Sequence, residues 1–241
     1  TLPRYVPLAL QNWRWVFAMG GGGLAGFSLL LVYAAQYTTA VNLGIMQGVI
    51  PAVVMLLGWL IYQTRIGWLQ FFGLCSSLTG ILVLVSTGSF ATILALRFNF
   101  GDLLMVAACL CYGAYTVALA KRLEMPPVLL LCFFAFCAFL TCSLFLIAEY
   151  ANGHLVLPEV KGSLLLFYSA IFPSILSQTF YMRGVELAGA NRAGLYVNMV
   201  PIFAAFLAML ILSETMYLYH IMALFMVLGG IFLAQRGKIK T

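Results

Sequence analysis

The chain has 241 residues, of which 64% are hydrophobic and only 7% are charged. A soluble domain carries about 25% charged residues, and a disordered chain carries even more charge and few apolar residues, so both classes are excluded. The formal charge of +6 does not indicate a nucleic-acid partner, because the basic residues stand singly between long apolar runs. The composition therefore predicts an integral membrane protein.

Eight apolar segments are long enough to cross a bilayer as helices, which requires about 20 residues. In chain order these spans are 14–35, 39–62, 66–86, 101–120, 127–148, 163–184, 192–212 and 216–235. No small-residue cleavage site follows any span, so no signal peptide is predicted. The sequence thus predicts an all-α integral membrane fold in contact with the lipid bilayer.

The distribution of Lys and Arg predicts the orientation of these spans. With eight spans, both visible termini lie on one side, and that side carries ten of the twelve basic residues. Only Arg97 and Lys161 fall on the other side. Because basic residues accumulate on the cytoplasmic side, both termini are expected in the cytoplasm.

An internal repeat with an offset of 150 residues is the most informative pattern. Aligned without gaps, residues 40–82 and 190–232 share ten identical positions, among them Ala40, Gly44, Pro51 and Gly80 of the first copy. The offset places span 2 on span 7 and span 3 on span 8. Five helices separate the copies, an odd number, so the two copies cross the membrane in opposite directions. Such inverted repeats are typical of secondary transporters.

The repeat also predicts the domain organisation. Spans 4 to 8 form five helices, whereas spans 1 to 3 supply only three, so two further helices are expected before Thr1. Residues 1–86 are interpreted as the last three helices of the first repeat, 87–100 as the inter-repeat loop, and 101–241 as the second five-helix repeat with a cytoplasmic tail. The expected fold is a helical bundle of inverted five-helix repeats, with eight helices visible and ten in the full protein.

Short motifs in this order resemble the EamA-type transporters of the drug/metabolite transporter superfamily. They are Gly101-Asp102-Leu103-Leu104, Tyr112 to Thr116, Lys121-Arg122, Asn198 to Pro201, Leu212-Ser213-Glu214 and Gly229-Gly230-Ile231, with Asn42 to Gly80 similar to the last two helices of the first repeat. The resemblance implies a central cavity and export of amino acids or other small metabolites across a bacterial inner membrane. One departure is Gln63-Thr64, where the first repeat of this family usually carries Gly-Glu, although Glu214 is kept in the second.

Polar groups within the spans are the candidates for substrate binding, since each is costly in a membrane unless it is used or paired. Proline within a helix removes one hydrogen bond, so Pro51 is expected to free the carbonyl of Gln47, and Pro201 that of Val197. The amides of Gln47 and Asn198 lie close to these bends. A packing kink with a satisfied amide is the alternative interpretation.

Two further groups could contribute to the cavity. Ser174, Ser177, Gln178 and Tyr181 are spaced to share one helix face beside Pro173, although serines also serve as contacts between membrane helices. Span 4 offers Tyr112 and Tyr115, whose spacing is more often that of packing residues. Glu214 and His220 are candidates for coupling transport to a proton, because histidine titrates near neutrality. At the edge of its span, however, His220 resembles an ordinary surface histidine.

We therefore predict a secondary transporter that exports amino acids or related metabolites by alternating access. A lipid-handling protein or a channel of the same fold stays open as an alternative. An intramembrane enzyme is less favoured, because only two histidines are present and neither has a partner suited to catalysis. The six cysteines lie in apolar runs and are interpreted as buried hydrophobic residues, so neither a metal site nor a cofactor is expected. The oligomeric state is left open.

Overall fold

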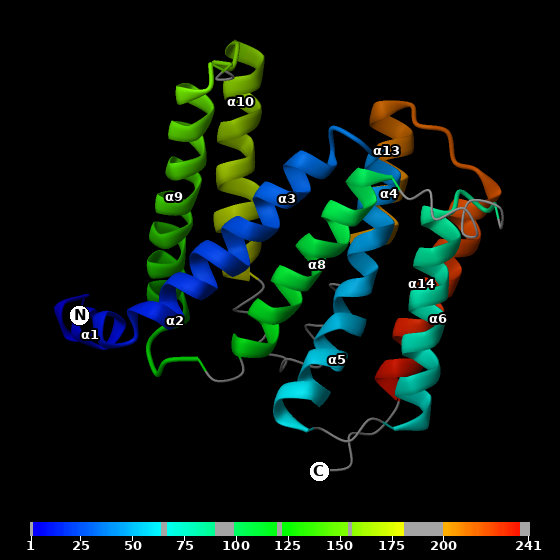
Figure 1. Cartoon of the computed structure of the whole chain (residues 1–241), viewed down its shortest axis with the longest axis horizontal. Coiled ribbons are helices and arrows are strands. Elements are labelled where there is room, and N and C mark those ends of the chain that lie inside the picture. Colours follow the sequence, from blue (N-terminus) through cyan, green and yellow to red (C-terminus); the bar gives the residue numbers. More distant parts are fainter. Residues whose placement is uncertain are drawn as a thin grey trace. The chain divides into compact units, whose positions relative to one another are not determined.

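The computed structural model describes residues 2–63, 67–89, 99–119, 122–153, 156–180 and 200–236. Every regular element in these ranges is a helix (Figure 1). Five helical stretches are long and apolar enough to cross a membrane: Trp13–Ala34, Ala40–Tyr62, Phe100–Ala118, Pro127–Ala151 and Val160–Phe180. Shorter apolar helices occupy Trp68–Leu84, Ile202–Leu212 and Leu218–Ala234. Each of the eight predicted spans thus contains a helix in its described part, while 181–184 of span 6 and 192–199 of span 7 lie outside the described residues. The all-α prediction is confirmed for the described residues.

The chain divides into two compact units, of which the first contains residues 1–21 and 123–197. Its helices are α1 (Leu2–Gln11), α2 (Trp13–Phe17), α9 (Pro127–Ala151) and α10 (Val160–Ser169). Helix α2 packs against α9, where the rings of Trp15 and Phe134 lie 5.6 Å apart. A Cβ atom at Gly20 would meet the backbone oxygen of Phe134, so this close approach requires glycine.

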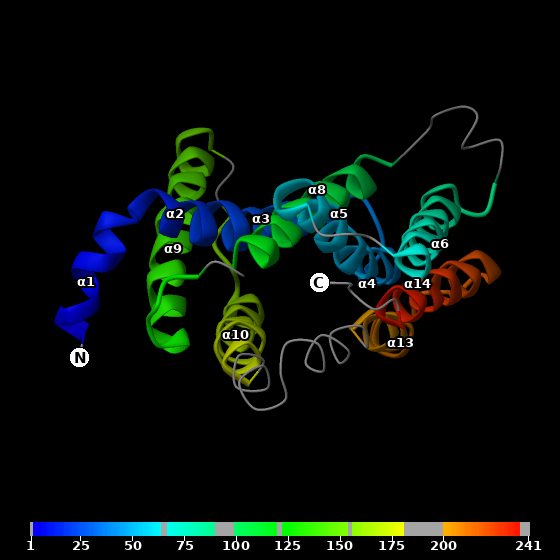
Figure 2. The same cartoon turned by 90° about the horizontal axis from the view of Figure 1, so that it is seen from below.

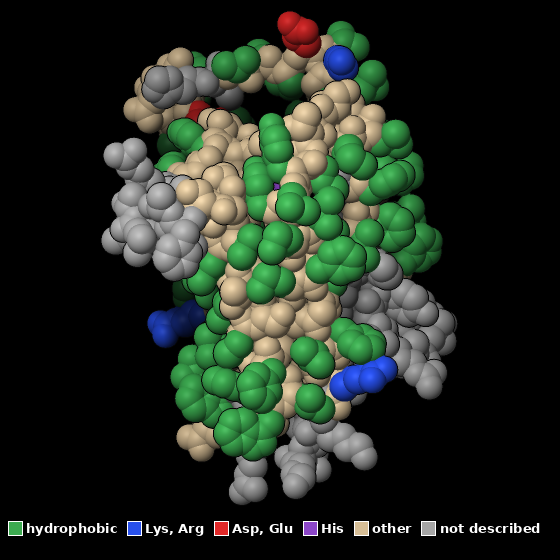
Figure 3. Space-filling model, turned by 90° about the vertical axis from the view of Figure 1, so that its right-hand side faces the viewer, with side chains coloured by type: hydrophobic (Ala, Val, Ile, Leu, Met, Phe, Trp, Pro, Cys, Tyr) green, Lys and Arg blue, Asp and Glu red, His purple; other side chains and the backbone are tan. Residues whose placement is uncertain are grey.

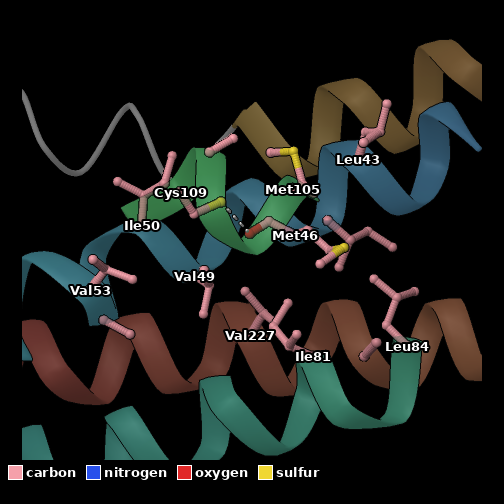
Figure 4. Close-up of a cluster of buried hydrophobic side chains, with 14 of the residues drawn as sticks. Leu43, Met46, Val49, Ile50, Val53, Ile81, Leu84, Met105, Cys109 and Val227 are labelled. Atoms are coloured by element: carbon pink, nitrogen blue, oxygen red, sulfur yellow. Dashed lines mark hydrogen bonds between the residues drawn. The ribbon is translucent and has the colours of Figure 1, made fainter. Parts of the chain in front are cut away.

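The second unit contains residues 22–122 and 198–241. Its helices are α3 (Gly26–Ala34), α4 (Ala40–Met46), α5 (Ile50–Tyr62), α6 (Trp68–Val85), α8 (Phe100–Ala118), α13 (Val200–Leu212) and α14 (Leu218–Arg236). All of them contribute buried apolar side chains or pack against the helices that do. In the close-up of this core, Met46 and Cys109 meet at the centre, where the Cys109 thiol donates to the Met46 carbonyl over 3.5 Å (Figure 4).

Helices α6 and α14 lie side by side in both ribbon views (Figures 1 and 2) and make the most extensive helix contact of the second unit. Gly73, early in α6, abuts Gly230, late in α14, whereas Gly80, late in α6, abuts Ala223, early in α14. The two helices are therefore antiparallel. Since they are spans 3 and 8, counterparts in the 150-residue repeat, the two copies run in opposite directions, as the inverted repeat predicts.

Hydrogen bonds in this pair join residues to their own repeat counterparts. The Ser76 hydroxyl donates to the carbonyl of Met226 at 2.9 Å, and the Ser77 hydroxyl to that of Val227 at 3.3 Å, each pair being 150 residues apart. Two equivalent segments meet in this way only where the symmetry axis that relates them passes between them. A pseudo-two-fold axis thus runs through the middle of the α6–α14 contact.

Two π-helical segments were not expected from the sequence, and they lie at equivalent positions of the repeat. They are η1 (Ala18–Ala25) in span 1 and η4 (Ala170–Leu176) in span 6. Shifted by 150 residues, η4 corresponds to 20–26, so the two segments overlap almost completely. π-Helical turns are rare and occur frequently at functional sites, which makes their paired occurrence informative.

The proline in span 2 interrupts its helix as predicted. Helix α4 ends at Met46, a 3₁₀ turn η2 (Gln47–Val49) follows, and α5 begins at Ile50 with Pro51 in its first turn. The Gln47 carbonyl, however, accepts a hydrogen bond from the Ile50 N–H within this turn. The tighter turn therefore satisfies the oxygen that we predicted to be free.

Large apolar side chains are exposed along the spans and are spread over the face shown in Figure 3, where charged side chains are few. This is the surface expected of helices that face lipid. The six cysteines, all of which are free, were interpreted as buried, and this is wrong for three of them. Cys109 is buried, but Cys75, Cys132 and Cys142 are exposed on their helices. Composition alone cannot distinguish a buried face from a lipid-facing one, because both are apolar.

Candidate functional site

An open groove of about 420 Å³ lies between α4 and α13 in the second unit. It is lined by Leu31, Ala40, Leu43, Gly44, Gln47, Ala204, Leu207, Ala208, Ile211 and Leu212. The two helices that form it are spans 2 and 7, which are counterparts in the repeat. The small residues on both walls leave room for the groove, and its volume falls within the range of about 300–1,000 Å³ that is usual for small-molecule sites.

Gln47 is the one polar side chain in this lining. It lies where α4 gives way to the 3₁₀ turn, so the sequence places an amide at the irregular point of the span, as predicted from Pro51. Its Nε2 atom is 3.5 Å from the Leu43 carbonyl, the outer limit of a hydrogen bond, and the amide is only partly buried. A solute in the groove could therefore exchange hydrogen bonds with Gln47 at little cost.

At one end of the groove, Glu214 joins the segment just beyond α13 to the start of α4. Its Oε1 atom accepts from the N–H of Ala40, and Oε2 accepts from the N–H of Val41, both at 2.9 Å. Thr39 completes the cap by accepting from the N–H of Asn42 at 3.2 Å. The carboxylate suits the partial positive charge of the helix N-terminus. Since Ala40 also lines the groove, Glu214 fixes the spacing of α4 and α13 at this end.

A chain of buried polar side chains begins beside this cap. The imidazole Nε2 of His220 lies 3.2 Å from Oδ1 of Asn42, whose Nδ2 donates to the Thr38 hydroxyl at 3.1 Å. The Thr38 hydroxyl donates in turn to Oδ1 of Asp102 at 2.8 Å. His220 and Asp102 are 4% and 3% exposed. The chain links α14, α4 and α8 at one end of the second unit.

The hydrogen bonds to His220 define its tautomer. The backbone N–H of Tyr217 points at Nδ1 over 3.0 Å, so Nδ1 is an acceptor and carries no proton. The ring proton is then on Nε2 and is donated to Asn42. The ring of Tyr219 lies 4.1 Å from the imidazole, centroid to centroid, and covers it on one side. His220 is therefore neutral in this arrangement.

Interpreting His220 as a surface histidine was wrong. Its place near the end of a span suggested exposure, but Asn42, 178 residues earlier in the chain, covers its outer nitrogen. The first repeat holds a glutamine at the equivalent position. There Oε1 of Gln70 accepts from the N–H of Gly67 at 2.8 Å, which reproduces the contact between His220 and Tyr217 at an offset of 150 residues.

Of the other predicted residues, Tyr112 and Tyr115 do not line this groove, and Ser174, Ser177 and Gln178 belong to the first unit. Tyr112 and Tyr115 pack with the core, their rings 5.6 Å apart, and Phe27 lies 5.1 Å from Tyr112. The hydroxyl of Ser174 donates to the carbonyl of Ser169 within the π-helical turn, and Ser177 is exposed. Gln178 is partly buried in the same helical stretch. Their role as a substrate-binding face stays a prediction.

Three members of the predicted set cannot be placed. Asn198 and Tyr181 lie outside the described residues, and for Pro201 only its backbone in α13 is described. Sequence reasoning also missed three residues that the structure brings together, namely Thr38, Asn42 and Asp102. Their polarity within or beside apolar spans was the available signal. Within the described residues, no group of His, Cys, Asp and Glu is arranged to hold a metal ion.

Comparison with known proteins connects this geometry to transport. The chain is 26% identical over 222 residues to "Uncharacterized transporter YetK" of Bacillus subtilis strain 168, which covers 90% of this chain and 66% of that protein. It is 23% identical over 209 residues to "Uncharacterized transporter YyaM" of the same strain, covering 86% and 68%. An uncharacterized transporter of Archaeoglobus fulgidus is 26% identical over 215 residues, covering 87% and 73%. This chain therefore spans about two thirds of the length of the first two relatives.

A solved crystal structure, described only as that of a protein, superposes with a TM-score of 0.62 at 19% identity, over 96% of this chain and 83% of that one. At this identity the likeness concerns the fold alone. The family model of the EamA-like transporters matches residues 2–86 and again 99–235, which together make up most of the sequence. With an all-helical fold, spans of membrane length and transporters as relatives, the chain belongs to the EamA-like transporter family.

Proposed function

We propose that this membrane transporter is a secondary carrier that exports amino acids or related small metabolites by alternating access. The α6–α14 contact carries this proposal, because there the two copies of the repeat meet antiparallel, each serine bonded to its own counterpart helix. Two inverted copies that exchange conformations would open a central site first to one side of the membrane and then to the other.

The groove between α4 and α13 is the proposed substrate site. It is formed by counterpart helices, as a site shared by two copies should be, and it contains one amide in an otherwise apolar lining. None of the described residues that line it is charged, so it suits a neutral or zwitterionic solute better than an anion. We further propose that Asn198, Pro201 and the face of Ser174, Ser177, Gln178 and Tyr181 contribute to the same pathway.

The proposed location is the bacterial plasma membrane, with both visible termini in the cytoplasm. The asymmetry of ten basic residues against two supports this orientation. The proposed partners are the small-molecule substrate and the lipid bilayer, with no nucleic acid and no cofactor. The division into a first repeat over 1–86 and a second over 101–241 belongs to the same proposal.

The test is uptake of labelled amino acids and metabolites into liposomes that contain the complete gene product, with and without a pH gradient. Gln47→Ala should reduce saturable flux by about tenfold, since the groove would lose its one amide. Gln36→Ala is the matched control, because Gln36 is exposed in the turn before α4 and should leave flux unchanged. Asn198→Ala tests the corresponding prediction in span 7.

Three outcomes would alter the proposal. Full flux in the Gln47→Ala protein would keep the transporter but reject the groove as the substrate site. Flux of labelled lipid in place of metabolites would favour the lipid-handling alternative, for which the open apolar groove offers a surface. Currents far above carrier turnover would indicate a channel of the same fold.

A further inference from the structure

The hydrogen bonds of the polar chain at the N-terminal end of α4 all run in one direction. Each donor in it is paired with the next acceptor, from Nε2 of His220 through Asn42 and Thr38 to the Asp102 carboxylate. The two ends, an imidazole and a carboxylic acid, are groups that take up protons, and both are almost fully buried. A purely structural network would not need titratable groups at both ends, and buried ones are costly in a membrane.

We propose that this chain is a proton-binding site, in which Nδ1 of His220 takes the proton and thereby opens the groove end held by Glu214. The inference deepens the proposed transport function, because it names a proton as the ligand that regulates the groove. Nothing is consumed or oxidised: a proton from solvent bonds to the lone pair of Nδ1, and the neutral ring becomes a cation.

Binding of this proton is incompatible with the present hydrogen bonds. Nδ1 now accepts from the N–H of Tyr217, and once protonated it becomes a donor facing another donor. The bond from Nε2 to Asn42 can remain, because Nε2 carries a proton in both states. The contact with Tyr217, which caps the start of α14, must therefore break.

The charges around the ring favour a defined new partner. Tyr217 faces it from the segment before α14 and Tyr219 from α14 itself. Asp102 of α8 is linked to the ring through Thr38 and Asn42. Helices α4 and η2 have no titratable residue, and α6 offers only the exposed Cys75. Glu214 is six residues before His220 and is the nearest carboxylate along the chain, so a cationic ring would attract it.

That carboxylate already holds the first two amides of α4, at Ala40 and Val41. A cationic imidazole would compete with these amides, and Glu214 cannot keep both bonds to α4 while it turns to the ring. Releasing the N-terminus of α4 frees Ala40, which lines the groove. Proton binding at His220 is thus linked to the width of the groove through one side chain.

The first repeat supplies a matched variant. Gln70, at the position equivalent to His220, makes the same capping bond to the backbone N–H three residues before it, yet glutamine takes up no proton. His220→Gln should therefore keep the cap closed at every pH. His220→Ala removes the acceptor, so the N–H of Tyr217 should lack its bond at every pH, but the variant has no cation to draw Glu214 away from α4.

The experiment is hydrogen exchange, followed by mass spectrometry, on the purified full-length protein in micelles at pH 8 and pH 5, corrected for the intrinsic exchange rate. In the wild type, amides in peptides that cover 39–42 and 214–220 should exchange about fivefold faster at pH 5, because a hydrogen bond is lost. The His220→Gln protein should be protected in both segments at both pH values. The His220→Ala protein should exchange fast at 217–220 and stay protected at 39–42 at both pH values.

An equal pH response in the wild type and the His220→Gln protein would overturn the proposal, as would a loss of protection at 39–42 at pH 5 in the His220→Ala protein. The measurement needs no substrate, so it is independent of the transport assay. A protein that moves no solute in liposomes but shows the predicted exchange would remove the proposed function and keep the proton site.

Discussion

At the scale of single residues, the contact that joins α13 to α4 is the carboxylate of Glu214. Both of its oxygens accept from backbone amides, and an amide side chain in its place would retain one acceptor and turn a donor towards the other N–H. Glu214→Gln should therefore lower the free energy of unfolding by about 1–2 kcal/mol, through loss of a charge-assisted bond at a helix N-terminus.

The measurement is chemical unfolding in detergent micelles. Glu159→Gln is the matched control, since Glu159 occupies the N-cap of α10, is exposed and makes no capping bond through its side chain. It should change the stability by less than about 0.5 kcal/mol. Equal effects of the two substitutions would show that Glu214 does not hold α4.

The same residues show how much of the candidate site could be predicted from the sequence. Glu214 and His220 were selected because charged and titratable groups are rare in apolar spans. Their partners could not be predicted, because Asn42 contacts His220, and Ala40 and Val41 contact Glu214, only through the tertiary fold, at separations of more than 100 residues. The exposure of His220 was misjudged for the same reason, because position along a span says nothing about which neighbouring helix covers it.

At the scale of helices, the antiparallel contact of α6 and α14 depends on glycines that allow the backbones to touch. A Cβ atom at Gly230 would meet the carbonyl oxygen of Gly73 and the side chain of Ser77, whereas a Cβ atom at Gly229 would meet nothing. Gly230→Ala should therefore destabilise the protein by about 1–3 kcal/mol through overpacking, and Gly229→Ala should be tolerated.

Thermal unfolding of the two variants in micelles decides between these expectations. The two glycines are adjacent in one helix and differ only in the face they occupy, so helix propensity cancels in the comparison. If both variants unfold at the same temperature, the close approach of α6 and α14 does not stabilise the fold.

Helix existence was predictable, whereas local geometry was not. About 20 apolar residues in a row can satisfy their backbone in a membrane only as a helix, which is why a helix lies in the described part of each predicted span. The π-helical turn η1 contains the glycines 20–23 and η4 contains Pro173, but these residues indicate an irregular helix without specifying a π turn. The 3₁₀ turn at Gln47 was foreseen as an interruption, because proline removes a defined hydrogen bond.

At the scale of the whole molecule, the 150-residue offset relates more than sequence identities. Helices α5 and α13 are each followed by a residue with a left-handed backbone, Gln63 with φ 51° and Ser213 with φ 54°. These two positions are also 150 residues apart. The same offset relates the α6–α14 hydrogen bonds and the two π-helical segments. A repeat visible as ten identities among apolar residues is thus expressed in backbone geometry, which similar composition alone would not produce.

This symmetry makes a prediction about topology. Because the copies are inverted, Gln63 and Ser213, at equivalent positions, should lie on opposite faces of the membrane. Single cysteines at these positions, in a background with the six native cysteines replaced by serine or alanine, should differ in their reaction with a membrane-impermeant maleimide in intact cells. Ser213→Cys should be labelled from outside, and Gln63→Cys only after the membrane is opened.

The inverted repeat predicts that the two positions lie on opposite sides of the membrane. The distribution of basic residues predicts which of them is cytoplasmic. The labelling therefore tests the two predictions separately. Labelling of Gln63→Cys alone from outside would reverse the orientation and keep the inversion. Labelling of both cysteines from the same side would contradict the inversion itself, and with it alternating access by exchange between the two copies. Both substituted positions are exposed helix ends with the same left-handed conformation, so a difference in reactivity reports their side of the membrane and not their local structure.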